Sequence, residues 1–389
     1  MKYSFDFCYQ SLNKNGEELC GDKVEIVKDD KGILAVLSDG LGSGVKANIL
    51  ATLTSKIIAT MISGGASIDE CIDTITSTLP VCSERGIAYS TFIILKIDND
   101  GNAYLVQYDC PASIVVKDGA VEEQPKKWRK VFEKEIFECE FKLGENDMVV
   151  MFSDGVINAG VGQLLNLGWT RKEVVDYVQE KYNPKMTAAD MTSELLGACD
   201  NLYMQKPGDD TTVVTVKVIK HMPVCVMVGP PVNAEEDDKV VSKLLSCTGK
   251  KVVCGGTTSQ IVAKKLGKPV EVDLKYFNAA VPPIGKIEGI DLVTEGVITL
   301  GKACEIIQEY AAQKGISKNV DLTKKDGATL LAKMLIKDST EITFLVGRAL
   351  NPAHQNPDLP LSLGLKLRLI EDIAEALEKI GKKVTIVKN

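Results

Sequence analysis

The expected order of strands and helices changes near residue 221, and this change most constrains the fold. Before it, short apolar runs alternate with tight turns, as at residues 23–27 and 33–38, which is typical of antiparallel hairpins. After it, strands and helices alternate, which is typical of a mainly parallel sheet. A chain of 389 residues also exceeds what one compact core usually holds. We therefore predict two domains, residues 1–220 and residues 221–389.

The first domain is predicted to be an α+β layered sandwich with helices on the outer faces of its sheets. Strands are expected at residues 23–27, 33–38, 90–97, 103–108, 113–116, 136–143, 148–153 and 211–219. Helices are expected at residues 44–63, from residue 67 onward, and at 170–181 and 188–205. The runs 136–143 and 148–153 are separated by a turn-forming segment, so they are expected to form a hairpin with each other.

The second domain is predicted to be a smaller α/β domain with a mainly parallel sheet. Its strands are expected at residues 224–228, 251–254, 270–272, 290–293, 343–346 and 384–387. Its helices are expected at residues 234–247, from the segment 255–258 through residue 266, and at residues 300–313, 327–336 and 363–380.

Composition excludes several classes of function. The net charge of −7 provides no basic surface for nucleic acid or for an anionic membrane. Residues 1–20 lack a basic segment followed by an apolar run, and no uncharged apolar stretch reaches the roughly 20 residues that span a bilayer. Eleven cysteines without a Cys-x-x-Cys pair suggest buried, reduced thiols, and two histidines argue against zinc. We therefore expect a cytoplasmic protein.

Four short segments place aspartate beside glycine or a second aspartate, at an end of an apolar strand. They are Gly21-Asp22, Ser38–Gly44, Ser153–Gly155 and Gly208–Thr211. A strand that ends at a carboxylate fixes that carboxylate at a sheet edge, and four of them can meet at one point. Such an all-oxygen site suits hard cations like Mg²⁺ and Mn²⁺. The spacing alone leaves a second interpretation open, because Asp-Gly pairs also make ordinary turns.

An all-oxygen site of this kind suits the hydrolysis of phosphate esters. Two divalent ions roughly 3.5–4 Å apart neutralise the phosphoryl oxygens and make a bound water a better nucleophile. Asp22, Asp39, Asp154 and Asp209 suit the holding of such ions. Residues 1–220 contain no histidine, which excludes Ser-His-Asp and Cys-His schemes in this domain.

In the order and spacing of these segments, residues 1–220 resemble the PP2C-type (PPM) metal-dependent serine/threonine phosphatases of the SpoIIE branch. The matching segments are Gly21-Asp22, Ser38–Gly44 at the start of a helix, Ser153–Val156 and Gly208–Thr212. The resemblance implies an αββα sandwich, two Mn²⁺ or Mg²⁺ ions, and hydrolysis of phosphoserine or phosphothreonine on a bacterial signalling protein. The branch often acts on antagonists of anti-sigma factors, which is the partner suggested here.

The resemblance also implies a role for each matched residue. Asp39 would bridge the two metals, and Asp22 with the Gly40 carbonyl would complete one of the two sites. Asp154 and Asp209 would complete the other site. A water between the ions would attack phosphorus in line, so Asp39 and Asp22 are the expected catalytic residues.

Two features of the wider family are missing from these residues. Animal-type members carry an arginine near the N-terminus that binds substrate phosphate, but the first arginine here is Arg85, which leaves Lys14 or Lys23 as substitutes. Members commonly use a histidine as the acid for the leaving group, so water is expected to take that role here. Glu17 and Glu18 precede Asp22, and each either assists a metal or lies in a solvated turn.

The helix expected to begin after Ser43 would also affect the electrostatics of this site. Ser43 is its expected N-cap, and the positive end of its dipole would favour an anion near Asp39.

Two other functions stay open. One is a catalytically silent protein that keeps this fold and binds phosphoproteins. The other is a phosphatase of small phosphorylated metabolites, with the second domain capping the site. The presence of all four matched aspartates favours an enzyme over a silent binder.

Small or turn-forming residues follow three strands of the second domain, at Gly229–Pro231, Gly255–Ser259 and Thr294–Gly296. In an open α/β sheet such strand ends line the ligand crevice. The segment Gly255–Thr258 opens a helix, where backbone amides suit an anion, although ordinary turns have the same composition. We expect a regulatory or docking module with a small-molecule ligand.

Overall fold

The computed structural model describes residues 2–78, 90–125, 127–131, 134–273, 282–312, 320–349 and 362–389. Arg85, the first arginine of the chain, and His354, one of its two histidines, lie outside these residues. The chain divides into two compact units, Met1–Lys220 and His221–Asn389, each with its own core. The ten cysteines that the structure describes are all free and are buried or half-buried.

The N-terminal unit contains eleven strands and five helices among its described residues. Its strands are β1 (Tyr3–Leu12), β2 (Asp22–Lys28), β3 (Gly32–Gly40), β4 (Ser90–Asp98), β5 (Asn102–Tyr108), β6 (Ile114–Lys117), β7 (Ala120–Glu122), β8 (Lys127–Val131), β9 (Lys134–Lys142), β10 (Met148–Phe152) and β11 (Thr211–Lys220). Its helices are α1 (Gly44–Ser63), α2 (Ile68–Thr78), α3 (Asp154–Ile157), α4 (Arg171–Lys181) and α5 (Ala188–Leu202).

These strands form two antiparallel sheets. One has the order β2-β3-β4-β5-β9-β8 and the other the order β1-β11-β10-β6-β7. Strand β1 had no counterpart among the predicted strands, yet it pairs with β11 along its whole length, from Tyr3 opposite Lys220 to Leu12 opposite Thr211.

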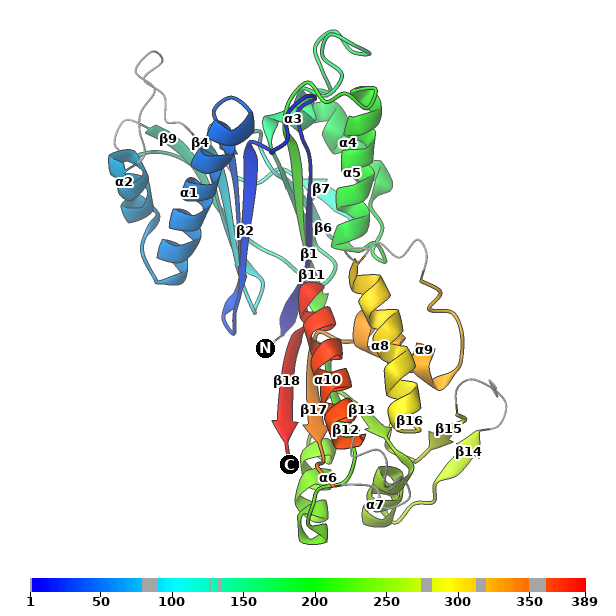
Figure 1. The fold of residues 1–389 in the computed structure, drawn as a ribbon. Coiled ribbons are helices and arrows are strands. Elements are labelled where there is room, and N and C mark those ends of the chain that lie inside the picture. The colour runs from blue at the N-terminus through cyan, green and yellow to red at the C-terminus, as the bar shows by residue number, and fades with distance from the viewer. Residues whose placement is uncertain are drawn as a thin grey trace. The chain divides into compact units, whose positions relative to one another are not determined.

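Three apolar layers hold the sheets and helices together. Residues of both sheets, such as Leu37 and Val216, share one core, while α1 and α2 cover the outer face of the first sheet and α4 and α5 that of the second (Figure 1). The alternation along β3 explains the layering: Leu37 faces the other sheet, and Val36 faces the helices.

The hairpin predicted for residues 136–143 and 148–153 is wrong. Strand β9 pairs with β5 and β8, whereas β10 pairs with β6 and β11 in the other sheet. All five residues of β10 are buried, so its backbone needs strand partners on both edges, which the middle of the second sheet supplies. The turn at residues 144–147 therefore crosses between sheets, and the Asp147 carboxylate secures it by accepting from the amides of Gly144 and Asp118.

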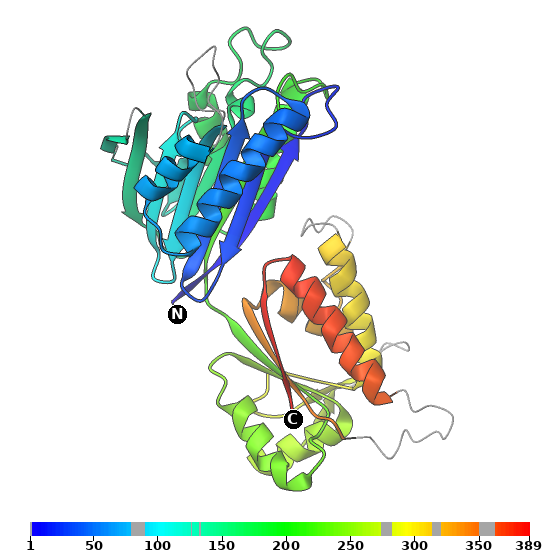
Figure 2. The same ribbon diagram turned by 60° about the vertical axis from the view of Figure 1, so that its left-hand side comes forward.

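Helix α1 has the predicted bounds and lies across the first sheet (Figure 2). Ala47, Ala51 and Ile58 are among its buried residues and face the sheet. Its length and apolar composition satisfy the criterion for a membrane span, but it contains Lys46 and Lys56 and so is not the uncharged apolar stretch that the sequence prediction excluded. Core helices of globular proteins satisfy the same criterion, so this observation is weak evidence for a membrane.

The C-terminal unit contains seven strands and five α-helices among its described residues. Its strands are β12 (Pro223–Val228), β13 (Lys250–Cys254), β14 (Glu271–Asp273), β15 (Ile284–Lys286), β16 (Leu292–Thr294), β17 (Glu341–Val346) and β18 (Lys383–Lys388). Its helices are α6 (Asp237–Leu245), α7 (Gly256–Leu266), α8 (Val297–Ala312), α9 (Gly327–Lys337) and α10 (Ser362–Lys379). A 3₁₀ turn, Ala234–Glu236, precedes α6, so the α-helix predicted from residue 234 begins three residues later.

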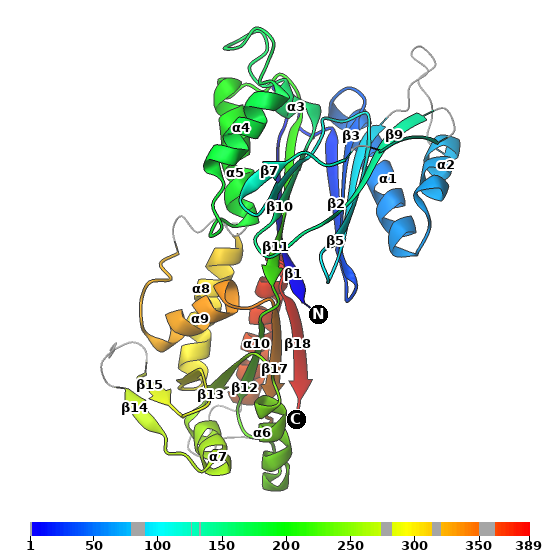
Figure 3. The ribbon, with the colours of Figure 1, turned by 180° about the vertical axis from the view of Figure 1, so that it is seen from behind.

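These strands form one sheet with the order β14-β15-β16-β13-β12-β17-β18. The five strands from β16 to β18 in this order run parallel, in agreement with the alternation of strands and helices. Strand β15 runs antiparallel to both of its neighbours, β14 and β16. Helices α8, α9 and α10 cover one face and α6 and α7 the other (Figure 3). The chain proceeds from β12 to β13 and β16 on one side, and then to β17 and β18 on the other. The carboxyl ends of β12 and β17 therefore flank a topological switch point, where open α/β sheets commonly bind ligands.

Candidate functional site

Asp22 and Asp39 lie directly opposite each other on the antiparallel strands β2 and β3. The Gly40 amide donates to the Gly21 carbonyl, and the Ser90 hydroxyl of β4 donates to the Asp39 carbonyl, so the backbone is held on both sides. Asp22 is only 4% exposed, yet neither of its carboxylate oxygens has a hydrogen-bond partner among the described residues. Two facing carboxylates, one of them unpartnered and buried, require a compensating cation or a proton.

Asp154 and Asp209 come from the second sheet. Asp154 follows β10 and is the first residue of α3, and Asp209 lies just before β11. Hydrogen bonds join these two segments, because the Ser153 amide donates to the Thr212 carbonyl and the Thr212 amide donates to the Ser153 hydroxyl. The pairing of β10 with β11 therefore brings together two carboxylates that are 55 residues apart in the chain.

Electrostatics place all four aspartates near one another. Burial first, and then the charges of Asp22, Asp154 and Asp209, raise the pKa of Asp39 to about 9. Burial raises the pKa of Asp22 to about 7. The hydroxyls of Ser153 and Thr212 lie near enough to oppose this rise without forming hydrogen bonds with the carboxylate, and the charges of Asp210 and Asp154 add to the rise.

The pKa values of Asp154 and Asp209 are also raised, in both cases chiefly by burial. The charge of Asp209 adds to the shift at Asp154, and the charge of Asp210 adds to the shift at Asp209. Repulsion among these carboxylates means that the cluster favours protons or cations.

Glycines beside the aspartates allow this close approach. A Cβ on Gly40 would lie 2.1 Å from the Ala47 carbonyl oxygen, and a Cβ on Gly155 would lie 2.2 Å from the Asp210 carbonyl oxygen. A Cβ on Gly21 would lie 2.8 Å from the Asp210 carboxylate. Each glycine therefore belongs to the packing of the site as well as to a turn.

Replacing Gly155 with alanine is expected to lower the free energy of unfolding by about 1–3 kcal/mol, because the new methyl group overlaps backbone of the Asp210–Thr211 segment. Chemical denaturation measures this loss. Gly197→Ala is the matched control, since nothing lies within 4 Å of its Cβ position in helix α5, and it is expected to leave stability unchanged or to raise it slightly. Equal stability of Gly155→Ala and the wild type would contradict the close packing described here.

The residues fit a divalent cation in their chemistry. They offer hard oxygen donors, two unpartnered oxygens on Asp22 and a third on Asp210. No three acidic, histidine or cysteine side chains of the described residues, however, converge closely enough to ligate one ion by themselves. Mg²⁺ usually keeps several waters and takes only one or two carboxylates, so a partly hydrated ion suits this arrangement.

Three residues at the site had no role in the sequence prediction of the metal ligands. Asp210 is 4% exposed and accepts from the Lys14 amide. Asp109 lies close enough to raise the pKa of Asp154 and has a left-handed backbone, with φ of 51°. The charge of Lys14 lowers the pKa of Asp209, so this lysine lies beside the cluster. The adjacent pair Asp209-Asp210 could have indicated Asp210 in the sequence, whereas no motif indicates Asp109.

The start of α1 differs from the prediction. Ser43 occupies the N-cap position, but its side chain does not cap the helix and its hydroxyl donates to Glu17 instead. A Cβ on Gly44 would overlap the Glu17 carboxylate, so Glu17 packs against the first turn of α1. Glu18 is exposed, and its carbonyl accepts from Asn13.

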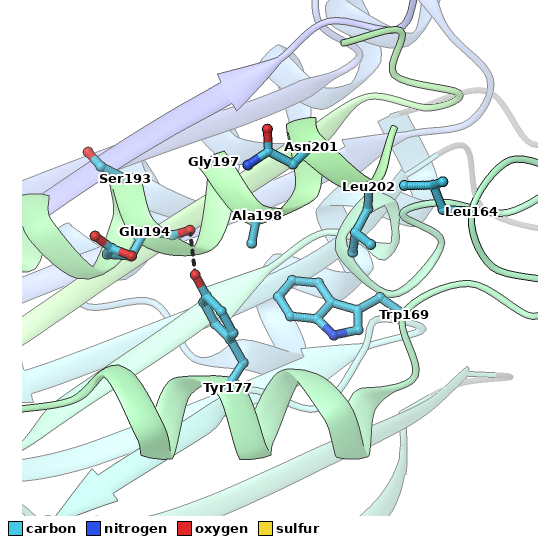
Figure 4. A pocket seen from close by; sticks show the side chains of 9 residues that line it. All are labelled: Leu164, Trp169, Tyr177, Ser193, Glu194, Gly197, Ala198, Asn201 and Leu202. Atoms are coloured by element: carbon cyan, nitrogen blue, oxygen red, sulfur yellow. Dashed lines mark hydrogen bonds between the residues drawn. The ribbon is translucent and has the colours of Figure 1, made fainter. Parts of the chain in front are cut away.

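A separate hollow of about 560 Å³ lies between α4 and α5 and contains none of the four aspartates (Figure 4). The Tyr177 hydroxyl donates to the Glu194 carbonyl across it. Its lining residues are Leu164, Trp169, Tyr177, Ser193, Glu194, Gly197, Ala198, Asn201 and Leu202.

Comparison with known proteins finds one family whose sequence model matches part of the N-terminal unit. Residues 29–219 match the sequence model of the family described as Stage II sporulation protein E (SpoIIE). No curated protein matches the chain.

Solved structures that are similar to the chain include the PP2C phosphatase domain of SpoIIE from Bacillus subtilis, with a fragment of its regulatory domain, at 20% identity and a TM-score of 0.49. That match covers 57% of this chain and 65% of the other, so less than two thirds of that structure is represented here. The RsbU and RsbW domains of a Mycobacterium tuberculosis protein match at 16% identity and a TM-score of 0.45, over 62% of this chain and 69% of the other. RsbX in complex with magnesium matches at 17% identity and a TM-score of 0.41, over 56% of this chain and 96% of the other.

Proposed function

We propose, from the membership of residues 29–219 in the SpoIIE family, that this chain is a metal-dependent phosphatase of phosphoserine or phosphothreonine on a protein. One observation carries the proposal: Asp22 is buried with both carboxylate oxygens unpartnered, among three further aspartates that raise one another's pKa values. A buried group of this kind is costly in a structural role and is typical of a functional site.

Asp22, Asp39 and the Gly40 carbonyl would hold one Mn²⁺ or Mg²⁺ ion, and Asp154 and Asp209 would hold a second. Waters would complete both sites, because no three of these side chains converge on one ion, and the Asp39 charge would act on both ions. The bound ions would supply positive charge for the phosphoryl oxygens and lower the pKa of a coordinated water. The cross-strand pairing of Asp22 with Asp39, and the hydrogen bonds that join Ser153 to Thr212, hold these carboxylates in place before a substrate arrives.

Lys14 is the cation we propose for the substrate phosphate. Its charge already acts on Asp209, so its ammonium is near the cluster, and no arginine occurs earlier in the chain than Arg85. No histidine is available in residues 1–220, so a water would supply the proton that the leaving group takes.

Hydrolysis of p-nitrophenyl phosphate with EDTA, Mg²⁺ or Mn²⁺ tests whether the site is catalytic. We expect turnover with a divalent ion and none with EDTA. A phosphoserine peptide is then compared with glucose 6-phosphate and AMP as substrates. Preference for the peptide supports a protein phosphatase, and preference for a metabolite supports the small-molecule alternative. Well-folded protein without turnover on any of these substrates would favour a silent phosphoprotein-binding role.

A further inference from the structure

Helix α9 of the C-terminal unit has a carboxylate as its N-cap. Asp326 is its N-cap, and one carboxylate oxygen accepts from the amides of Ala328 and Thr329, at 3.1 and 3.0 Å. The other oxygen accepts from the Thr329 hydroxyl at 2.9 Å. Two backbone donors and one threonine hydroxyl are therefore satisfied by a single anionic group.

Helix α7 also has a threonine three residues after its N-cap, but its N-cap residue has no carboxylate. Gly255 takes the place of Asp326, with φ of 117° and no side chain to cap the helix, and Thr258 takes the place of Thr329. Thr258 is 1% exposed, and its hydroxyl has no hydrogen-bond partner among the described residues. That hydroxyl lies 3.1 Å from the point where a Cβ on Gly255 would be, so it faces the position from which a capping side chain would project. Gly256 and Thr257 are exposed, which leaves the first turn open to a ligand.

This helix start lies at the carboxyl edge of the parallel strands. Gly255 follows β13 directly and donates its amide to the Thr294 carbonyl of β16, and the Gly229 amide after β12 donates to the Cys254 carbonyl. The ends of β12, β13 and β16 are thus bonded side by side, near the switch point between β12 and β17.

A buried positive charge occupies the same edge. Lys366 of α10 is 8% exposed, and its ammonium donates to the Gly347 carbonyl after β17 at 2.6 Å and lies against Gly229. Within the described ranges, its recorded partner is this carbonyl and no carboxylate charge acts on it, and burial lowers the pKa of its ammonium. A buried ammonium without a counter-ion is unfavourable. An anion bound at this edge would give the Thr258 hydroxyl a hydrogen-bond partner and the Lys366 ammonium a counter-ion.

We propose that the carboxyl edge of this sheet binds a small molecule bearing a phosphate group. The phosphate would accept from the amides of Thr257 and Thr258 and from the Thr258 hydroxyl, as the Asp326 carboxylate does in α9, and Lys366 would supply positive charge. Phosphate suits these donors better than a monocarboxylate because it has more acceptor oxygens and up to two negative charges. Glu295 lies beside Gly256 and would accept from a hydroxyl on the rest of the ligand.

Calorimetric titration of the full chain in EDTA, with inorganic phosphate, AMP and glucose 6-phosphate, tests the proposal. EDTA keeps divalent ions from the aspartate cluster, so binding there is suppressed. We expect at least one of the three to bind, Thr258→Val to weaken it about tenfold, and Lys366→Met to weaken it by at least about tenfold. Tighter binding of an ester identifies a phosphorylated metabolite as the ligand, and tighter binding of inorganic phosphate identifies the free ion.

Thr329→Val is the matched control, because its hydroxyl already bonds Asp326. It is expected to lower the unfolding midpoint and leave the affinity unchanged, whereas Thr258→Val is expected to leave the unliganded midpoint unchanged because its hydroxyl has no partner to lose. The proposal is overturned if none of the three compounds binds at millimolar concentration, or if Thr258→Val and Lys366→Met bind as the wild type does.

Discussion

Asp39→Asn is expected to abolish metal-dependent phosphate ester hydrolysis and, at the same time, to raise the stability of the metal-free protein. Asparagine keeps the shape of the side chain and its place opposite Asp22, but it removes the charge that would be shared between two ions. Loss of about 4 kcal/mol of transition-state stabilisation corresponds to a fall in kcat/KM of about a thousandfold. The metal-free protein gains because burial, and then the charges of three neighbouring aspartates, oppose ionisation of Asp39 in the folded chain, whereas the unfolded chain lets it ionise freely.

Two measurements check this combination: kcat/KM for p-nitrophenyl phosphate with Mn²⁺, and the unfolding midpoint in EDTA at neutral pH or above. Asp147→Asn is the control, because Asp147 is also a buried aspartate, but it accepts from the amides of Gly144 and Asp118 away from the cluster. It is expected to lower stability and keep activity. If Asp39→Asn kept activity within tenfold of the wild type, Asp39 would not be a ligand that catalysis requires.

The part of the site that is local in sequence was the easiest to predict. Asp22 and Asp39 lie at the same end of one hairpin, and the alternation of residues 23–38 is enough to set them opposite each other. The strand ends suggested that Asp154 and Asp209 join the other two, but their assignment to one metal came only from the resemblance, because their approach depends on the pairing of β10 with β11 across more than fifty residues. No local pattern encodes such a pairing.

The error at β9 and β10 has the same origin. Two apolar runs joined by a short polar turn look like a hairpin in sequence, and what separates them is competition among strands for partners. The burial of both faces of β10 decides that competition, and burial is a property of the whole domain. Asp109 was missed for a related reason, since it reaches Asp154 through the fold and carries no motif.

In the C-terminal unit, the fold was easier to predict than the candidate site. Its strand and helix order was predictable from periodicity, whereas the contrast between Gly255 and Asp326 as helix caps became informative only with side-chain partners in view. In the sequence, Gly255–Thr258 has the composition of an ordinary turn. The unpartnered hydroxyl of Thr258 distinguishes this segment from an ordinary turn.

Removing divalent metal is expected to make the stability of the N-terminal unit fall as pH rises from about 4 to about 9. An aspartate in an unfolded chain has a pKa of about 3.9, whereas in the folded chain Asp22 titrates at about 7 and Asp39 at about 9. The folded state therefore binds these protons more tightly than the unfolded state does. The resulting stability is fully present below pH 4 and is lost as pH rises through the two folded-state values, on the order of several kcal/mol in all.

Bound Mn²⁺ should reverse this trend, because the ion replaces the protons and binds better as the carboxylates ionise. The experiment compares unfolding midpoints in EDTA and in Mn²⁺ at about pH 5 and about pH 8.5, where we expect the gain from Mn²⁺ to be small and large, respectively. Asp39→Asn should flatten the metal-free profile, because it removes the group with the higher folded-state pKa. A metal-free midpoint that stays level or rises across this range would mean that neither burial nor mutual repulsion raises the pKa values of Asp22 and Asp39 in the folded chain. The case for a cation at their centre would then lose its physical basis.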